Sequence, residues 1–553
     1  MNKKRMVSSL LCLILLFQWN GYTPHALAKE TETCKVRTLV TQDKFSNLQW
    51  AYYDLIENIN IEEAWKLSKD AENEVTVAII DTGIDYLHAD LAPNMWVNED
   101  EVMDSSLDND ENGYEGDYYG WNFVDGNAEI CNYEKSSKTG LYADIHGTHV
   151  AGIIGAVADN GIGIAGVAAY SKVKLMSCKA LGSEGEGNMS AIIEAIEYAE
   201  NNGASICNLS LGTSDYSKAL YKAIKNSKML FVCAAGNGTK DTNMQGYDIS
   251  KSPVYPAGYQ LDNIITVANT NNTGQLDSSS CYSNQYVDIA APGTSIVSAY
   301  VDEEHTPLGR YVKETGTSMA APFVTGTAAM IASYYGNLPA NVIKKMILGG
   351  SRKVDALCSK VRDGAFLDVY GAMSYKGMMA SVQTEVTDLP YSNYKKCHVT
   401  IENPMKDTLT LRYAKGNQDL SYFQQGEKGE AFEWKENKTT KTIKETTEYT
   451  VYLRDSLGNE QVYTEKIVVP KLTGIKLSTT KKTLKKGEKF RLEAAIKESN
   501  AYASIVYDTS NPKVAKVSSS GNVAAKNKGT TTITVTAIDG NTVKKAKCKV
   551  TVK

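Results

Sequence analysis

Cysteine is sparse and irregularly spaced in this chain of 553 residues. The chain has ten cysteines, no two of them form a CxxC pair, and the nine that remain after Cys12 show no regular framework. This spacing argues against a CxxC metal site and against a disulfide-stapled scaffold. Cys178, Cys207 and Cys233 lie inside apolar runs, which favours small buried side chains at these positions.

Long apolar runs are also lacking, except at the start of the chain. Basic residues at positions 3–5 precede a mostly apolar stretch over 6–17, and Ala26 and Ala28 supply the small residues of a cleavage site. This order is typical of an export signal, here over residues 1–28. No later run reaches about 18 apolar residues, so we expect a secreted, extracellular chain without a membrane-spanning helix.

Acidic residues are scarce at the C-terminal end. Residues 471–553 contain 18 Lys and Arg against 5 Asp and Glu, a net charge of +13 within a chain of net charge -5, so the remainder carries -18. This asymmetry indicates an anionic partner for the basic segment, for which we name a cell-wall polymer. A solvated basic surface without a partner remains the alternative, and we expect no nucleic-acid partner.

Two patterns of apolar residues divide the chain. Over about 73–373, continuous apolar runs such as VTVAII alternate with helical patterns such as MSAIIEAIEYAENN. They predict an α/β domain with a doubly wound, mostly parallel sheet, whose ligands bind beyond the carboxyl ends of the strands. After about residue 377, apolar and polar residues alternate with turn signals, which predicts β-sandwich domains over 377–470 and 471–553.

Three polar residues stand where such a sheet would place chemistry. Asp81 ends an apolar run in AIIDTGID, His146 begins a helical pattern in HGTHVAG, and Ser318 does so in GTSMAAP. A serine hydroxyl needs an imidazole to accept its proton, and the imidazole needs a carboxylate to fix its tautomer. These residue types therefore predict a nucleophilic triad.

The three motifs, in this order, resemble those of the subtilisin-like serine proteases, the subtilases, over residues 48–376. The resemblance implies a serine endopeptidase that cleaves proteins or peptides through an acyl-enzyme. It also implies that the side-chain amide of Asn237, in FVCAAGNG, forms an oxyanion hole with the backbone of Ser318. Taken alone, without the three motifs, Asn237 would be interpreted as part of a plain Asn-Gly turn.

The same resemblance implies two substrate-binding backbone segments. Ser210, Leu211 and Gly212 match the strand that pairs with the substrate before the cut, and Gly185 and Gly187 match the opposing strand. Ordinary glycine turns are the alternative for both segments.

Two departures from the family pattern concern the pocket nearest the cut. Gly238 stands where many relatives have a polar side chain, and Val254 stands near a position that is often glycine. We expect a shallow, uncharged pocket.

An acidic loop suggests a metal site. Asp108, Asp110 and Asn112 alternate before Gly113, Asp117 follows, and no glutamate closes the loop at the twelfth position. Oxygen ligands at this spacing are typical of calcium loops, and similar insertions in subtilases bind calcium. We expect a structural calcium ion here, with an acidic surface turn as the alternative. A second stretch, 159–167, also resembles a calcium loop of the family, without assigned ligands.

Outside the peptidase region, the phrase NPKVAKVSSSGNVAAKNKGTTTITVTA within 471–553 resembles bacterial Ig-like modules of the BIG2 type. Residues 29–47 form a short N-terminal segment. Two other functions stay open at this point. One is an inactive subtilase fold that serves as a surface-binding protein, and the other is an adhesin in which the β-domains carry the main activity.

Overall fold

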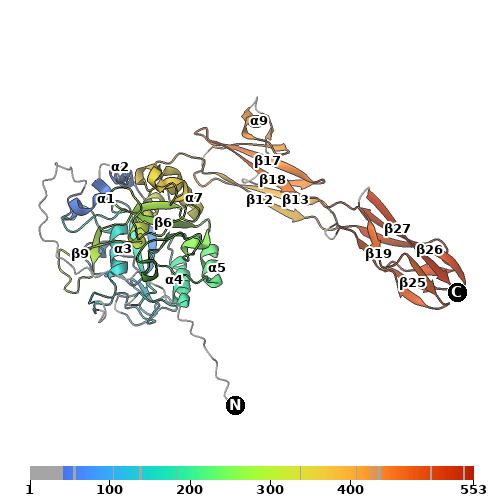
Figure 1. Cartoon of the computed structure of the whole chain (residues 1–553), viewed down its shortest axis with the longest axis horizontal. Coiled ribbons are helices and arrows are strands. Elements are labelled where there is room, and N and C mark those ends of the chain that lie inside the picture. The colour runs from blue at the N-terminus through green and yellow to red at the C-terminus, as the bar shows by residue number, and fades with distance from the viewer. Residues whose placement is uncertain are drawn as a thin grey trace, which may run out of the picture. The chain divides into compact units, whose positions relative to one another are not determined.

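The structure is a computed structural model that describes residues 41–553, apart from 54–57, 104, 136–139, 183–184, 337, 407, 425–427, 432–437, 499–500 and 540–541. The predicted export signal and residues 29–40 lie outside the described residues. The chain divides into two compact units, Met1–Gly377 and Met378–Lys553 (Figure 1). Among the helices that are described, none has both the length and the apolar character needed to cross a bilayer.

The first unit is built on one large sheet of nine strands, in the order β10-β11-β7-β6-β5-β4-β1-β3-β2. All neighbouring pairs are parallel except β10 with β11, so the predicted mostly parallel α/β sheet is confirmed. β8 and β9 form a separate antiparallel hairpin. The strands are β1 (Val75–Asp81), β2 (Gly120–Asn122), β3 (Val173–Lys179), β4 (Ile206–Leu209), β5 (Leu230–Ala234), β6 (Ile264–Thr270), β7 (Ile289–Pro292), β8 (Ile296–Tyr300), β9 (Arg310–Glu314), β10 (Arg352–Lys353) and β11 (Ala365–Phe366).

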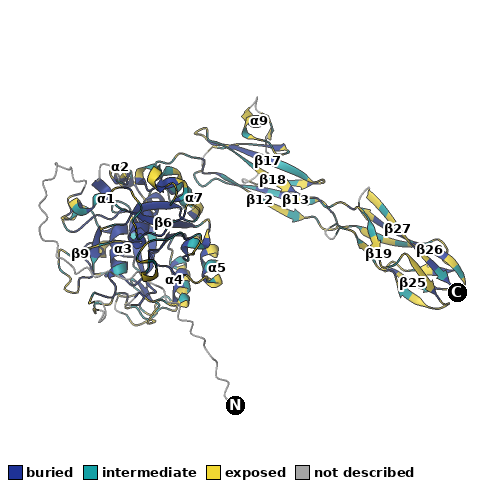
Figure 2. Cartoon of the chain, in the orientation of Figure 1, coloured by how far each residue is buried: buried dark blue, intermediate teal, exposed yellow. Residues whose placement is uncertain are grey.

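Helices pack against this sheet and enclose the core. α6 contacts β4, β5, β6 and β7, and α4 contacts β1 and β3. Figure 2 shows the buried residues of this unit gathered around the sheet. Asn188 and Ser217 cap α4 and α5 with side-chain oxygens that accept backbone N–H groups of the first turn. The helices are α1 (Trp50–Tyr53), α2 (Ile61–Ser68), α3 (Ile145–Gly155), α4 (Met189–Asn201), α5 (Lys218–Asn226), α6 (Thr317–Tyr335), α7 (Ala340–Gly350) and α8 (Val369–Met373).

The strand cysteines are buried, as their apolar context predicted. Cys178, Cys207 and Cys233 have no exposed surface and carry free thiols. Burial raises the pKa of each thiol, so all three stay protonated at neutral pH. They act as small apolar side chains of the core.

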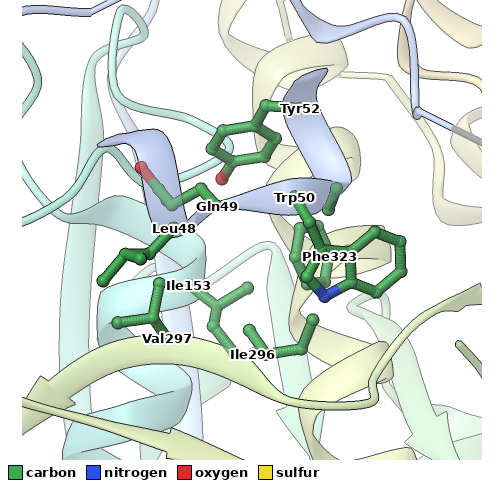
Figure 3. A pocket seen from close by; sticks show the side chains of 9 residues that line it. Leu48, Gln49, Trp50, Tyr52, Ile153, Ile296, Val297 and Phe323 are labelled. Carbon is green, nitrogen blue, oxygen red and sulfur yellow. The ribbon is translucent and has the colours of Figure 1, made fainter. Parts of the chain in front are cut away.

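Residues 41–53 run across the first unit and join its parts. The backbone N–H of Phe45 donates to Gly163 O at 2.8 Å, and the indole of Trp50 donates to Thr294 O at 3.0 Å. Beneath this segment lies a narrow apolar pocket between α3, α6 and β8 (Figure 3). None of the predicted site residues lines it, so we assign it no role in chemistry. Its lining is Leu48, Gln49, Trp50, Ala51, Tyr52, Ile153, Ile296, Val297 and Phe323.

The second unit consists of β-sheets that are antiparallel apart from one strand pair, in agreement with the alternating pattern. Residues after Gly377 form the sheets β12-β13-β16 and β15-β14-β17-β18. Their strands are β12 (Ser381–Asp388), β13 (Lys395–Glu402), β14 (Thr410–Lys415), β15 (Glu430–Ala431), β16 (Lys438–Ile443), β17 (Thr447–Arg454) and β18 (Glu460–Ile467), with the helix α9 (Leu420–Gln424) between β14 and β15.

The last domain packs the sheets β20-β27-β26-β23 and β21-β25-β24 around an apolar core that includes Val535, Cys548 and Val550. A small pair, β19 with β22, adds to it, and only β20 with β27 is parallel. The strands are β19 (Ile475–Leu477), β20 (Lys481–Leu484), β21 (Lys489–Arg491), β22 (Ala494–Ile496), β23 (Ser504–Thr509), β24 (Ala515–Val517), β25 (Asn522–Ala525), β26 (Gly529–Asp539) and β27 (Thr542–Val552).

Candidate active site

The predicted aspartate and histidine meet at the carboxyl end of the sheet. Asp81 is the last residue of β1, and His146 lies in the first turn of α3. The two are joined by a hydrogen bond of 2.7 Å from His146 Nδ1 to Asp81 Oδ1, which also accepts the backbone N–H of Thr82 at 2.7 Å. Burial alone would lower the pKa of His146, but the charge and hydrogen bond of Asp81, with a smaller effect of Glu314, raise it above its ordinary 6.5.

A close backbone contact holds α3 against the end of β1. The N–H of Gly147 donates to Thr82 Oγ1 at 3.1 Å, and a Cβ atom at Gly147 would lie 2.2 Å from the carbonyl oxygen of Gly83. Only glycine permits this approach, which sets the position of the imidazole relative to Asp81. The glycine at the second position of HGTHVAG is therefore required by this close packing of α3 against the end of β1.

A buried ion pair between Lys179 and Asp144 adjoins Asp81. Lys179 stands directly beside Asp81 in the parallel register of β1 and β3, and its Nζ is 2.6 Å from Asp144 Oδ1. Both side chains are almost fully buried. Burial raises the pKa of Asp144 to about 6 despite the opposing effect of Lys179. This pair was not predictable from the sequence, because the two residues are brought together only by the strand register and by the entry into α3.

Ser318 lies in the first turn of α6 and is linked twice to Ser210. The Ser318 hydroxyl donates to Ser210 O at 3.1 Å, and the Ser210 hydroxyl donates to Ser318 O at 2.8 Å. Behind them, Thr325 Oγ1 donates to Asn208 Oδ1 at 2.7 Å, and Asn208 Nδ2 donates to Ser210 Oγ at 2.9 Å. These buried side chains therefore form one bonded chain that fixes the serine at the helix N-terminus.

The amide of Asn237 is oriented by the same helix start. Its Oδ1 accepts the backbone N–H of Thr317 at 3.0 Å. This bond fixes the orientation of the side-chain amide and so identifies its other terminal atom as the donor Nδ2. A Cβ atom at Gly316 would lie 3.0 Å from this Nδ2. Among the described residues, neither Nδ2 nor the backbone N–H of Ser318 has a hydrogen-bond acceptor. Both donors remain available on one side of Ser318.

The first predicted substrate segment follows β4. Ser210, Leu211 and Gly212 are buried, and the next residue pairs with Tyr255. A Cβ atom at Gly212 would lie 2.7 Å from Val254 Cγ1, so the valine side chain occupies the space beside this segment.

The second predicted segment is a tight turn after β3. Leu181 pairs with Gly187, and the backbone N–H of Gly182 donates to Glu186 O at 2.8 Å. Gly185 has a φ of +77°, a conformation that glycine adopts without strain. The neighbouring Glu184 lies outside the described residues.

Comparison with known proteins agrees with this geometry. The family model described as "Subtilase family" matches residues 72–372, which is more than half of the chain. The chain belongs to the subtilase family. A second model, described as "Bacterial Ig-like domain (group 2)", matches residues 471–550 of this subtilase.

Among its relatives, this subtilase is 33% identical to Subtilisin-like protease 1 of Plasmodium vivax over 60% of this chain and 52% of that protein. It is 32% identical to thermitase of Thermoactinomyces vulgaris over 50% of this chain and 81% of that protein. It is 33% identical to a thermophilic serine proteinase of Bacillus sp. (strain AK1), over 50% of this chain and 56% of that protein. The chain spans about half the length of the Plasmodium relatives that it matches.

The second histidine of the HGTHVAG motif is a packing residue in this subtilase. His149 is fully buried, and its Nε2–H donates to Ile296 O at 3.0 Å. Burial lowers its pKa to about 3, so the ring is neutral. Its bonded Nε2 joins α3 to β8.

The acidic loop brings together a different set of carboxylates from the predicted one. One oxygen each of Glu101, Asp110 and Asp117 lies within 4.8 Å of the others, and Glu101 and Asp117 are buried. Asn112 donates to both Asp110 and Asp117 through Nδ2, at 3.0 and 3.2 Å. Asp108 instead accepts backbone N–H groups of the turn at Asn112 and Gly113. Glu101 was missed because it precedes the loop by seven residues and has no spacing signal.

The second loop, 159–167, meets two buried aspartates. Asp43 accepts the backbone N–H groups of Asp159 and Asn160 at 3.0 and 3.1 Å. Asp90 accepts the N–H of Ile164 at 3.0 Å and the Asn160 amide at 2.6 Å. Burial raises the pKa of Asp90 to about 6. The loop is thus tied to the N-terminal segment, which the sequence did not indicate.

Proposed function

We propose that this subtilase is a secreted serine endopeptidase that hydrolyses peptide bonds in proteins through an acyl-enzyme at Ser318. The observation that carries the proposal is the joint geometry of Asp81, His146, Ser318 and Asn237. Asp81 and His146 are hydrogen-bonded to each other, and Ser318 stands at a helix N-terminus where Asn237 Oδ1 accepts the N–H of the preceding Thr317. Acyl transfer requires these parts together.

In this mechanism His146 accepts the Ser318 proton while Asp81 stabilises the imidazolium. The bond from His146 Nδ1 to Asp81 leaves Nε2 as the acceptor. The same imidazolium later donates its proton to the leaving amine. Water then attacks the acyl-enzyme with the same base, which restores the serine.

Substrate binding releases the nucleophile. The Ser318 hydroxyl donates to Ser210 O, so its proton is directed away from His146. A substrate strand that pairs along Ser210, Leu211 and Gly212 brings its own backbone N–H to Ser210 O. That N–H replaces the hydroxyl, which then turns toward His146.

The tetrahedral oxyanion is stabilised by Asn237 Nδ2 and the backbone N–H of Ser318. Because Thr317 N–H fixes the other amide atom, the Asn237 donor is oriented before the substrate arrives. Preorganised donors of this kind supply a large part of catalysis in acyl transfer.

The substrate is an extended protein segment between 185–187 and 210–212. Main-chain pairing accepts many sequences, so selectivity comes from the side-chain pockets. Val254 fills space between Gly212 and Gly236, which supports a shallow, uncharged pocket for the residue before the cut.

We further propose structural calcium at the loop of Glu101, Asp110 and Asp117. The residues fit calcium, because three carboxylates with oxygens within 4.8 Å of one another supply the hard oxygen ligands that calcium prefers. The pKa of Asp117 is raised by burial, which is the cost of a buried carboxylate without a neutralising cation. When bound, the ion would stabilise the fold and would take no part in the reaction.

The export signal and the basic C-terminal domain support a place outside the cell. We propose that the enzyme is secreted and that residues 471–553 bind an anionic cell-wall polymer. The charge of +13 on that domain motivates this partner.

The test is covalent labelling followed by peptide-library cleavage. A fluorophosphonate should modify Ser318 alone, as located by peptide mass mapping, and the same protein should cleave a mixed peptide library with a reproducible preference before the cut. A folded chain that is neither labelled nor active would instead be a surface-binding protein on a subtilase fold.

A further inference from the structure

One face of the C-terminal domain carries an ordered array of lysines and threonines. On β27 the side chains alternate: Cys548, Val550 and Val552 are buried, and Lys545, Lys547 and Lys549 are exposed. β26 alternates in the same way and presents threonines outward. We call this outer surface of the sheet β20-β27-β26-β23 the lysine–threonine face. Its lysines are Lys481, Lys545, Lys547 and Lys549, and the threonines beside them on β26 are Thr530, Thr532, Thr534 and Thr536.

The strand register arranges these residues in rows. Lys549 pairs with Lys481 on one side and with Thr532 on the other, Lys547 pairs with Thr534, and Lys545 pairs with Thr536. Along β27 the lysines repeat every two residues, about 6.7 Å apart, and each threonine column lies about 4.8 Å to the side. The face therefore offers a line of positive charges beside a line of hydroxyl groups.

The repulsion between these lysines raises the free energy of the folded domain, and the stability of the fold gives no reason for placing them side by side. Like charges directly opposite each other, such as Lys481 and Lys549, destabilise a sheet. Lysines often protect edge strands from aggregation, but β27 is an interior strand with neighbours on both sides. Among the described residues, no carboxylate forms an ion pair with the four lysines. Asp508, the one carboxylate opposite the threonine column, already accepts the N–H of Thr509.

We propose that the lysine–threonine face binds a linear polyanion with phosphodiester groups, laid along β27. The inference rests on the anionic partner proposed above and assigns its surface and its chemistry. Lysines neutralise the phosphate charges, and the neighbouring threonine hydroxyls donate to phosphate oxygens.

Other anionic partners fit the face less well. Its outward positions carry no aromatic side chain on which nucleic-acid bases would stack. Exposed apolar side chains, Val506, Ile538 and Val543, are confined to one end, whereas the lysines continue along the strand. A membrane surface is therefore the less favoured ligand and becomes an arm of the test.

The experiment compares two triple variants of the full chain, both in a Ser318→Ala background that prevents self-digestion. The first changes Lys545, Lys547 and Lys549 to Gln. The matched control changes Lys489, Lys516 and Lys526 to Gln, which removes the same charge from exposed positions on the sheet β21-β25-β24 and beside it. Far-ultraviolet circular dichroism and melting curves confirm that both fold.

The probes are fluorescent poly(glycerol phosphate), polyglutamate of equal charge, and phosphatidylglycerol vesicles, each titrated at low and physiological salt. The face variant should bind poly(glycerol phosphate) at least about tenfold more weakly, and the control less than about threefold. A Thr532→Val, Thr534→Val double variant should weaken poly(glycerol phosphate) binding and leave polyglutamate binding unchanged.

Three results would overturn the proposal in different ways. Equal losses in the two triple variants would show diffuse attraction by the whole domain and remove the assigned face. Vesicles bound more tightly than the polymer would make the surface a membrane contact. If the unaltered chain binds none of the probes, the anionic partner in the proposed function fails as well, whereas labelling of Ser318 in the active chain would still support the peptidase.

Discussion

The peptidase region and the C-terminal domain differ in whether their polar side chains are buried or exposed. The peptidase buries them in bonded sets, such as Asn208, Ser210 and Thr325, whereas Thr531 is the one buried polar side chain described in residues 471–553. Buried polar groups interact strongly and keep fixed positions, and exposed lysines are screened by salt. The proposed chemistry therefore rests on fixed, buried groups of the first region, and the proposed polymer binding rests on exposed charges of the last domain that salt should screen.

This contrast means that each region should fail independently of the other. Changes in the buried sets should alter turnover or pH dependence and leave polymer binding intact. Changes on the lysine–threonine face should do the reverse.

The largest expected effect comes from the nucleophile. Ser318→Ala should lower kcat by about a million-fold, as loss of the nucleophile does in subtilisin, because no other group forms the acyl-enzyme. Melting temperature and polymer affinity should stay near those of the unaltered chain. Steady-state peptide hydrolysis measures the effect, and Ser214→Ala, in the exposed turn after the substrate segment, is the control. A folded Ser318→Ala protein with more than a few per cent of the activity would refute the assignment.

A smaller loss is expected at the oxyanion donor. Asn237→Ala should reduce kcat about a hundred- to a thousandfold with little change in KM, because its Nδ2 acts on the transition state rather than on the bound substrate. Asn243→Ala, at a nearby exposed turn, should leave kcat unchanged. A loss seen mainly in KM would instead assign Asn237 to ground-state binding.

Calcium removal should affect stability and leave the chemical step unchanged. A ligand at a hundred times its Kd stabilises the folded state by about 2.7 kcal/mol, so chelation should lower the Tm of a domain of this size by roughly 4 °C. Asp117→Asn should abolish this response, whereas Asp108→Asn should retain it, because Asp108 binds the turn backbone. Calorimetry with and without chelator decides between the predicted and the observed carboxylate sets. Identical curves for the unaltered chain would remove calcium from this loop.

The smallest effect concerns the charge near the base. Glu314 raises the pKa of His146, and only the neutral imidazole accepts the serine proton, so activity grows as pH rises through that pKa. Burial raises the pKa of Glu314 itself to about 7, so its charge acts on His146 near neutral pH and is largely absent at lower pH. Glu314→Gln should therefore lower the pKa of His146 and move the acid limb of kcat/KM slightly to lower pH, with about a twofold gain near pH 7 and little change near pH 5 or pH 8. Glu304→Gln, an exposed change on the turn before β9, is the control. An acid limb that moves to higher pH would contradict the electrostatic role of Glu314.

The sequence was sufficient for the sheet and for the motif residues. Apolar runs that end in Asp81, and helical patterns that begin at His146 and Ser318, are local signals, and a parallel sheet brings their ends to one edge. The alternation after Gly377 was equally local. Neither signal depends on knowing which distant strand is the neighbour.

What escaped prediction depends on distant register. Lys179 meets Asp144 because β3 lies beside β1, and Glu101 meets Asp117 because the loop folds back on itself. The lysine–threonine face needed the pairing of β26 with β27. The local sequence around Lys179 and around Glu101 does not identify these partners.

The bond from the Ser318 hydroxyl to Ser210 O has a consequence for what escapes cleavage. Proline has no backbone N–H, so at the position before the cut it cannot take over the Ser210 carbonyl, and the hydroxyl stays where it is. An N-methylated residue fails for the same reason. Compact loops that cannot straighten are spared as well, since their N–H groups are held by their own fold. In the proposed mechanism, attack therefore requires a substrate backbone that can straighten and that has a free N–H at the residue before the scissile bond.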